Sequence, residues 1–512
     1  MNMDMKNIFK YTLVTLAAAS MLTACDLDLF PVGSLVYNPE SVITNETDLT
    51  GFEAGVIAQF RGIAGGGVLD EPQDIMMDYF NALGDYGNNY GGVHRTDDSF
   101  SADDYDSRDN WRYPYLAIRH FNIVINGAQT VPDGLQAKAA IARGEAYVAR
   151  AYAYLHMIRL FAKPYGSSSS TDLGLPIILK YDQTERPSRN TVQEVYDQIK
   201  SDLDSAAVLL AGVKGEVRAQ KPTIDFVNAM YARYYLDTKQ YAQAASAAEK
   251  VIGSAAGYKL AATAEEFAAE FVEDNGKEPI LQFYGSLQEG GYGEHTYYAN
   301  MAIDSEEGHG QYYRPYFIPT KKLAEAYGEG DLRNSWLTDG TVAIYENGSW
   351  YTSEFKVFKK YSGNPALRTT DLPNTRQMLK PITIAEIYLI AAEAYAGAGN
   401  SAKATECLNA LQTARGAEAT SASTANIQNE WYRETVGQGL RISCLKRWGL
   451  GYSGRAPQDG AASAGVVITQ PNFIDKSMPA NDYHFVWPVP KHELQVNPNL
   501  VQNEGYAAIT VE

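Results

Sequence analysis

Two segments of the chain repeat one pattern of small and aromatic residues, 160 positions apart. Residues 222–252 read PTIDFVNAMYARYYLDTKQYAQAASAAEKVI, and residues 383–415 read TIAEIYLIAAEAYAGAGNSAKATECLNALQTAR. The positions that align are Ala232 with Ala392, Tyr235 with Tyr395, Ala244 with Ala404 and Val251 with Leu411. Small residues at fixed places let two helices approach closely, as in tetratricopeptide repeats. The repetition therefore predicts tetratricopeptide-like helix pairs and a mainly α-helical fold.

A third helix pair is expected near residues 136–210. Ile141, Val148 and Leu155 recur every seven residues on one face, and Pro164 and Gly166 end the first helix. A second helix is expected near Val192–Leu210, and another helix near Tyr115–Ala128 precedes this pair. The three pairs form the predicted scaffold.

Long insertions separate the helix pairs and differ from them in composition. Residues 60–115 and 258–380 are rich in Gly, Tyr, Asn and Asp, with short β-like runs at Ile280–Phe283 and Phe355–Tyr361. We predict a helical scaffold with a loop-rich second half that contains β-hairpins, built as one domain from residues 25–512. Loops on a rigid scaffold commonly carry binding residues.

The N-terminus has the features of a secretory signal. Lys6 and Lys10 precede a mostly apolar run from Tyr11 to Ala24. This run would extend about 21 Å as a helix, too short for a hydrocarbon core of about 30 Å. Leu22-Thr23-Ala24-Cys25 resembles a bacterial lipobox, which implies that residues 1–24 are removed and that Cys25 is lipidated. The acyl chains would anchor the mature protein to a membrane.

Four sequence elements together resemble the SusD/RagB family of nutrient-binding outer-membrane lipoproteins. They are DLDLFP after Cys25, IRLFAKPYG at 158–166, RETVGQGLRISCLKRWG at 433–449, and YHFVWPVPKHELQVNPNLVQNEGY at 483–506. One departure is Ser443-Cys444, which stands where the family often has an acidic residue.

The resemblance implies a SusD-like fold and a surface lipoprotein that lies over a TonB-dependent transporter. Such proteins capture a glycan or, in the RagB branch, a peptide, and hold it for import. The net charge of −18 is a separate observation, and it argues against nucleic acid as a ligand.

Aromatic residues in glycine-rich loops are the candidate ligand contacts, because sugar C–H faces stack on aromatic rings. The candidates come from GDYGNNYGG (84–92), GGYGEHTYYAN (290–300) and QYYRPYF (311–317), where glycines are expected to expose the rings. They are Asp85, Tyr86, Asn88, Asn89, Tyr90, Tyr292, Tyr297, Tyr298, Tyr312, Tyr313, Arg314 and Tyr316.

The sequence contains no HExxH, G-x-S-x-G, Walker or CxxC motif, and we predict no enzymatic activity and no required cofactor. The glycine run GIAGGGV (62–68) lacks the lysine of a phosphate-binding loop. Acidic residues gather at Asp103, Asp104, Asp106 and Asp109, which could hold a structural calcium ion or supply a glycosidase carboxylate pair. Glycan capture is the leading hypothesis; peptide capture and a surface glycoside hydrolase remain alternatives.

Overall fold

The helix pairs predicted from the repeated segments are present in the computed structural model. It describes residues 42–180, 182, 184–293, 301–304, 310–346, 348–369 and 375–509. Residues from Ile43 onward cluster into one unit, and the following description concerns this unit. The predicted signal segment and Cys25 lie outside the described residues. No described helix is both long enough and apolar enough to cross a membrane.

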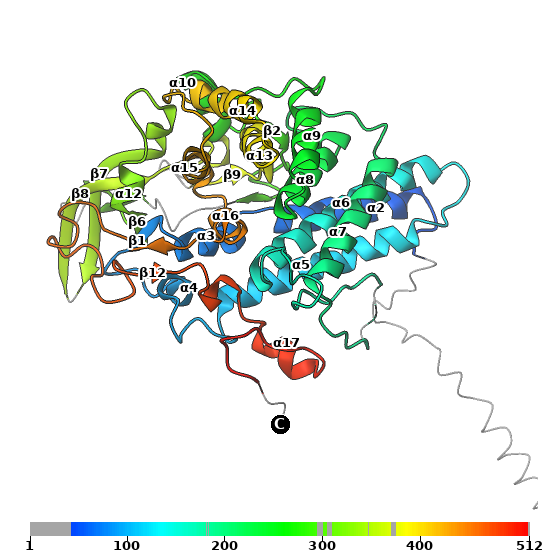
Figure 1. The fold of residues 1–512 in the computed structure, drawn as a ribbon, viewed down its shortest axis with the longest axis horizontal. Helices are drawn as coiled ribbons and strands as arrows, with labels where there is room; N and C mark the ends of the chain where they lie inside the picture. Colours follow the sequence, from blue (N-terminus) through cyan, green and yellow to red (C-terminus); the bar gives the residue numbers. More distant parts are fainter. Residues whose placement is uncertain are drawn as a thin grey trace, which may run out of the picture. The chain divides into compact units, whose positions relative to one another are not determined.

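The two repeated segments form helix pairs that pack on each other. The pairs are α8 (Ile224–Asp237) with α9 (Tyr241–Ile252), and α13 (Ile384–Gly397) with α14 (Ser401–Ala414). Helix α9 also packs against α13, which joins the pairs into one layer (Figure 1). At this contact a side chain on Gly397 would lie 2.6 Å from Cγ of Tyr241, so glycine permits the close approach. The predicted helical scaffold is therefore confirmed.

The third predicted pair consists of α6 (Gln136–Phe161) and α7 (Val192–Leu209). Thr191 caps α7, because its side chain accepts from the Glu194 amide while the Glu194 side chain accepts from the Thr191 amide. Gly144 lets α6 approach Leu210 at the end of α7 closely. Helices α2 (Glu46–Ile63) and α5 (Tyr105–Gly127) pack against α6.

Helix α5 begins ten residues earlier than the sequence analysis expected. Asp104 caps its start by accepting from the backbone amides of Asp106 and Ser107. The polar stretch before Tyr115 therefore continues the helix, and Trp111 is buried on its inner face at 2% exposure. Helix α2 was not predicted.

Short strands gather in the loop-rich half. The largest sheet has the order β4-β5-β7-β8, with β4 (Met301–Asp304), β5 (Gly310–Tyr313), β7 (Leu337–Glu346) and β8 (Ser349–Phe358). Two-stranded antiparallel sheets pair β1 (Phe80–Ala82) with β6 (Phe317–Pro319), β2 (Pro279–Leu281) with β10 (Ile382–Thr383), β3 (Tyr292–Gly293) with β9 (Gln377–Met378), and β11 (Tyr452–Ser453) with β12 (Ser477–Met478). The predicted runs at 280–283 and 355–361 overlap β2 and β8.

Short helices connect these strands to the scaffold. They are α3 (Gly67–Met76), α4 (Gly91–Arg95), α10 (Ala264–Phe271), α12 (Lys321–Ala324), α15 (Thr424–Thr435), α16 (Arg441–Trp448) and α17 (Lys491–Val496). Three 3-10 turns are also described, η1 (Leu332–Trp336), η2 (Pro365–Leu367) and η3 (Tyr483–Phe485). Figure 1 shows the β7–β8 hairpin at the opposite edge of this unit from α2, α6 and α7.

A buried ion-pair network holds the loop-rich half against the scaffold. Arg415, at the end of α14, donates to Glu278 at 2.6 and 3.0 Å and to Glu434 of α15 at 2.6 Å. Arg333 of η1 donates to the same Glu434 at 3.0 Å, and both arginines are fully buried. Although burial favours its protonated form, Arg415 and Arg333 lower the pKa of Glu434 to about 2.

We predict that Arg415→Ala lowers the free energy of unfolding by about 3–5 kcal/mol, because it leaves the buried Glu278 carboxylate without its arginine and Glu434 with Arg333 alone. Denaturant unfolding followed by circular dichroism measures this loss. Lys403→Ala is the control, because Lys403 forms an exposed pair with Glu406 at 3.1 Å in α14. That variant should change stability by less than about 1 kcal/mol. Equal losses in the two variants would contradict the assigned role of the network.

Candidate ligand-binding surface

Two of the predicted loops meet at an ion pair. Asp85 follows β1, and Arg314 lies between β5 and β6; their side chains approach to 3.1 Å. The pairing of β1 with β6 brings the two loops together, since Ala82 lies opposite Phe317. Asp85 also accepts from the backbone amide of Tyr345 in β7 at 3.3 Å. Asp85 therefore connects both predicted loops to the β7–β8 hairpin.

The hairpin adds aromatic rings beside Arg314. Tyr345 and Trp350 are cross-strand partners, with ring centroids 5.3 Å apart. The Trp350 ring also makes an edge contact with Tyr312 at 5.8 Å, and the Arg314 guanidinium lies 5.8 Å from its centroid. Tyr345 is 47% exposed and the Arg314 side chain 44%. We call this group of Asp85, Tyr312, Arg314, Tyr345 and Trp350 the Trp350 platform.

Tyr86 does not have the exposure that the sequence analysis expected, since its side chain is only 8% exposed. Its ring packs edge-on against Phe317 and Phe473, each with a centroid distance of 6.0 Å. Arg95 donates to the Tyr86 hydroxyl at 2.8 Å, and burial raises the pKa of that hydroxyl. Burying the large apolar ring is favourable even though its neighbours in the sequence are glycines. Tyr86 therefore packs inside the protein and supports the loop rather than projecting from it.

The neighbouring candidates hold this loop in shape. Asn88 accepts from Arg95 at 2.8 Å, and Asn89 donates to the Tyr86 carbonyl at 2.7 Å. Tyr90 donates to Glu71 at 3.3 Å and adopts a left-handed backbone conformation, φ 53°, before α4. These side chains order the loop that carries Asp85.

The remaining predicted aromatic residues are spread over other places. Tyr292 lies in β3 beneath the Arg376 guanidinium, 4.9 Å from its ring centroid. Tyr313 packs over Gly340, and Tyr316 is half-buried between β5 and β6. Tyr297 and Tyr298 lie outside the described residues. The candidate set therefore does not form one continuous surface within the described residues.

Sequence reasoning missed Tyr345 and Trp350, the two rings at the hairpin end. A usable signal was present in AIYENGSWY (343–351), because Asn-Gly between alternating residues strongly favours a two-residue hairpin turn. Such a turn places residue 345 opposite residue 350, the register that the structure has.

The predicted calcium ligands lie at the start of α5. Asp104 serves as the helix cap, and burial raises its pKa to about 6. Burial and the neighbouring Asp104 raise the pKa of Asp106 to about 8. In the part of the chain that the structure describes, no group of three or more His, Cys, Asp or Glu side chains is arranged to hold a metal ion. A calcium site here stays a prediction.

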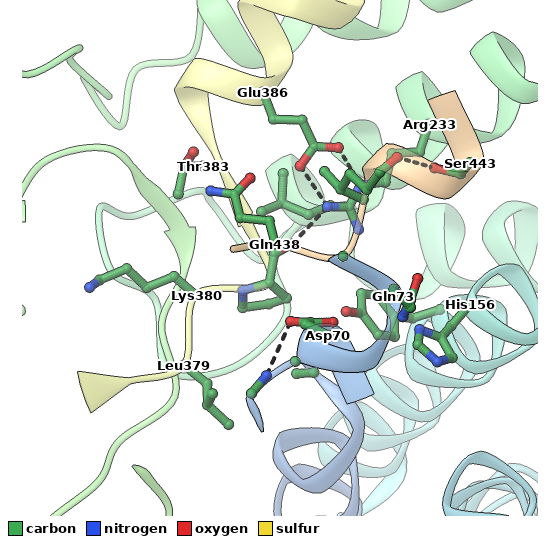
Figure 2. Close-up of a pocket in the computed structure, with 18 of the residues that line it drawn as sticks. Asp70, Gln73, His156, Arg233, Leu379, Lys380, Thr383, Glu386, Gln438 and Ser443 are labelled. Carbon is green, nitrogen blue, oxygen red and sulfur yellow. Dashed lines mark hydrogen bonds and ion pairs between the residues drawn. The ribbon is translucent and has the colours of Figure 1, made fainter. Parts of the chain in front are cut away.

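A partly open pocket shares no residue with the Trp350 platform. It has a volume of about 90 Å³ and is lined by residues of α3, α6, α8 and α13 and by the segments 360–361, 377–383 and 438–440 (Figure 2). It contains no residue that the sequence analysis proposed as a ligand contact.

Comparisons with known families cover most of the chain. A family model named SusD-like, described as starch-binding and associating with the outer membrane, matches residues 56–236. The SusD family model matches residues 229–506, more than half of the chain. The chain is also 25% identical over 532 residues to SusD-like protein P2 of Formosa agariphila, which covers 97% of this chain and 100% of that protein.

Solved structures with the same fold are more distant in sequence. A SusD superfamily protein from Bacteroides thetaiotaomicron is 22% identical, covers 89% of this chain and 99% of its own, and gives a TM-score of 0.70. A laminarin-binding SusD-like protein is 20% identical, covers 90% of this chain and 100% of its own, and gives a TM-score of 0.66. These structures have the same fold as this chain.

We predict that Asp85→Ala loosens the β7–β8 hairpin without unfolding the protein. A net hydrogen-bond contribution of about 0.5–1.5 kcal/mol corresponds to about 2- to 10-fold faster hydrogen exchange at the Tyr345 amide. Mass spectrometry of exchanged peptides measures this rate. The control is Asp97→Ala, which removes an ion pair to Arg95 at 3.2 Å without touching the hairpin. Unchanged exchange at Tyr345 in Asp85→Ala would refute the role of this carboxylate.

Proposed function

Because the chain belongs to the SusD family, we propose that it captures a glycan on the Trp350 platform and passes it to a transporter without cleaving it. The observation that carries this proposal is the grouping of Trp350 and Tyr345 at the exposed end of the β7–β8 hairpin with Arg314 of the neighbouring loop, held in place by Asp85. Aromatic rings contact the C–H faces of sugars, while the guanidinium donates to hydroxyl oxygens.

Charge at the platform favours an uncharged glycan. The Arg314 cation is paired with Asp85, whose side chain is only 10% exposed, so the platform has no unpaired charge to attract an anionic sugar. The net charge of −18 also disfavours polyanions at long range. The laminarin-binding relative makes laminarin oligosaccharides the first neutral probes for this chain.

Modest affinity suits capture followed by release. A few aromatic contacts of about 0.5–1.5 kcal/mol each, with several hydrogen bonds, correspond to dissociation constants from about micromolar to millimolar. Such a complex dissociates readily, which delivery to a second protein requires. We infer that the partner is a TonB-dependent outer-membrane transporter, in line with the family resemblance and the lipobox at Cys25.

We expect Trp350→Ala to weaken binding of laminarin oligosaccharides, or of the neutral glycan that a polysaccharide array identifies, by about ten-fold or more. A ten-fold loss corresponds to about 1.4 kcal/mol, the scale of one aromatic contact with its buried area. Isothermal titration calorimetry measures the dissociation constant.

Tyr351→Ala is the matched control for this experiment. Tyr351 is 40% exposed on the same hairpin, and side chains of adjacent strand residues point to opposite faces. Its substitution should leave affinity within about two-fold. Equal affinities of the wild type and Trp350→Ala, or competition by peptides but not by sugars, would overturn the proposed site. Release of shorter sugars by the purified chain would overturn capture without cleavage.

Membrane attachment through Cys25 gives a separate prediction. In cells grown with labelled palmitate, the wild-type chain should carry label and sediment with the outer membrane, because two or three acyl chains anchor a protein firmly. Cys25→Ser should lose the label and the sedimentation. Cys407→Ser is the control, since Cys407 is buried on α14 and should leave both unchanged. Labelled Cys25→Ser protein would contradict the lipid anchor.

A further inference from the structure

The pocket between the scaffold and the loop-rich half begins at the glycine run of residues 62–68. Gly65 and Gly66 line it with φ angles of 109° and 104°, which side-chain-bearing residues rarely adopt. This turn between α2 and α3 directs Asp70 and Gln73 of α3 to the pocket wall (Figure 2). The Asp70 carboxyl accepts from the Gly66 amide at 3.1 Å. The glycine run, which has no role at the platform, therefore shapes this pocket.

Several polar side chains of the lining have hydrogen-bonding atoms that no described residue uses. Gln73 donates to the Leu69 carbonyl at 2.8 Å, and no described group donates to its side-chain oxygen. His156 Nε2 lies 2.9 Å from the Asn110 side-chain oxygen. Because the Asn110 oxygen can only accept, His156 Nε2 must carry the proton and donate it to that oxygen. In the neutral ring, His156 Nδ1 is then an acceptor. Gln438 has no side-chain hydrogen bond among the described residues, and both functions of its amide remain available.

Most charges around the pocket are neutralised within the protein. Arg233 forms two bonds to Glu386 at 2.7 and 2.6 Å, and Arg159 binds Asp237 at 2.6 Å. Lys380 pairs with Asp274 at 2.7 Å. An anionic ligand would have to displace a carboxylate to pair with Arg233, Arg159 or Lys380, so the arrangement selects against it.

Two titratable groups in the lining, Asp70 and His156, are uncharged at neutral pH. Burial raises the pKa of Asp70 to about 8 and lowers that of His156 to about 4. At neutral pH Asp70 then carries a proton that it can donate, and the His156 ring is uncharged. Burial lowers the pKa of Lys360 to about 7, and its ammonium donates to the backbone carbonyls of Glu434 and Val436.

The volume limits what the pocket can hold. A water needs about 10–15 Å³ of such volume, so 90 Å³ corresponds to about six to nine positions the size of a water molecule. A cavity of about 150 Å³ holds a benzene molecule. The pocket is therefore too small to enclose an oligosaccharide, and Leu155 and Leu379 add apolar walls to its polar groups.

We propose that this pocket is a second binding site, for one small uncharged polyol with three or four carbons and adjacent hydroxyls. Hydroxyls donate and accept, so one chain of them can donate to Gln73 and His156 and accept from Gln438 and Asp70. Its C–H groups would contact Leu155 and Leu379. This site shares no residue with the Trp350 platform, and the proposal does not depend on the proposed glycan function.

Saturation-transfer NMR with the full chain tests the proposal, with glycerol and erythritol as probes. The signal should saturate with a dissociation constant of about 1–10 mM, a reasonable affinity for six to eight heavy atoms. Gln438→Leu should weaken binding at least about five-fold, because it removes the amide from a half-buried side chain that supports no other group. Gln73→Leu should have a similar effect, while circular dichroism confirms that both variants fold.

Two matched variants and one charged probe complete the experiment. Gln243→Leu should retain binding, because Gln243 is exposed on α9 and does not line the pocket. Trp350→Ala should also retain it, which separates this site from the platform. Glycerate should bind at least about ten-fold more weakly than glycerol. The proposal is overturned by a signal that rises linearly without saturation, by unchanged binding in both Gln438→Leu and Gln73→Leu, or by preferred binding of glycerate.

Discussion

The buried pairing of Arg333 and Arg415 with Glu434 favours one position of the β7–β8 hairpin relative to the scaffold. Arg415 ends α14, Glu434 lies on α15, and Arg333 belongs to η1, which leads directly into β7. The carboxylate must sit between both guanidinium groups, because one buried charge without its partner costs several kcal/mol. An alternative packing of η1 would break this arrangement, so the network favours one position for β7 and, through β7, for Tyr345 and Trp350.

Buried cations also account for the basic residues of the RISCLKRWG segment (441–449). Arg441 pairs with Asp78 and Arg447 with Glu393, while Lys446 donates to the carbonyls of Arg159 and Ala162 at the end of α6. The last carbonyls of a helix have no partner within it, and a buried ammonium satisfies them. The two arginines find carboxylates on α3–β1 and α13 rather than on their own helix. An acidic residue at Ser443 or Cys444 is therefore not needed to balance them, and Ser443 instead donates to the Leu440 carbonyl.

Periodicity and small residues sufficed to predict the scaffold, because helix pairs are determined by local spacing. The close approach of Gly397 in α13 to Tyr241 in α9 was not among these predictions, because it depends on how the two pairs pack on each other. The candidate site was harder to predict. Asp85 and Arg314 were proposed separately, but their contact depends on the β1–β6 pairing across more than two hundred residues. Tyr86 was proposed from its glycine neighbours, yet burial of an aromatic ring depends on Phe317 and Phe473, which sequence position alone does not place nearby.

The Trp350 platform and the pocket share one electrostatic feature, although they differ in shape and size. At both places the arginines are already paired with carboxylates, so no arginine is left to bind an anionic ligand. At both proposed sites we therefore expect recognition through hydrogen bonds and apolar contacts, which suits uncharged, hydroxyl-rich molecules. Size separates the ligands: the rings of Trp350 and Tyr345 form an open edge along which a long glycan can extend, whereas the pocket holds about 90 Å³. An oligosaccharide long enough to bind the platform does not fit into the pocket. A small polyol is too short to contact Trp350, Tyr345 and Arg314 together. We therefore expect the two proposed sites to be occupied independently in the same molecule.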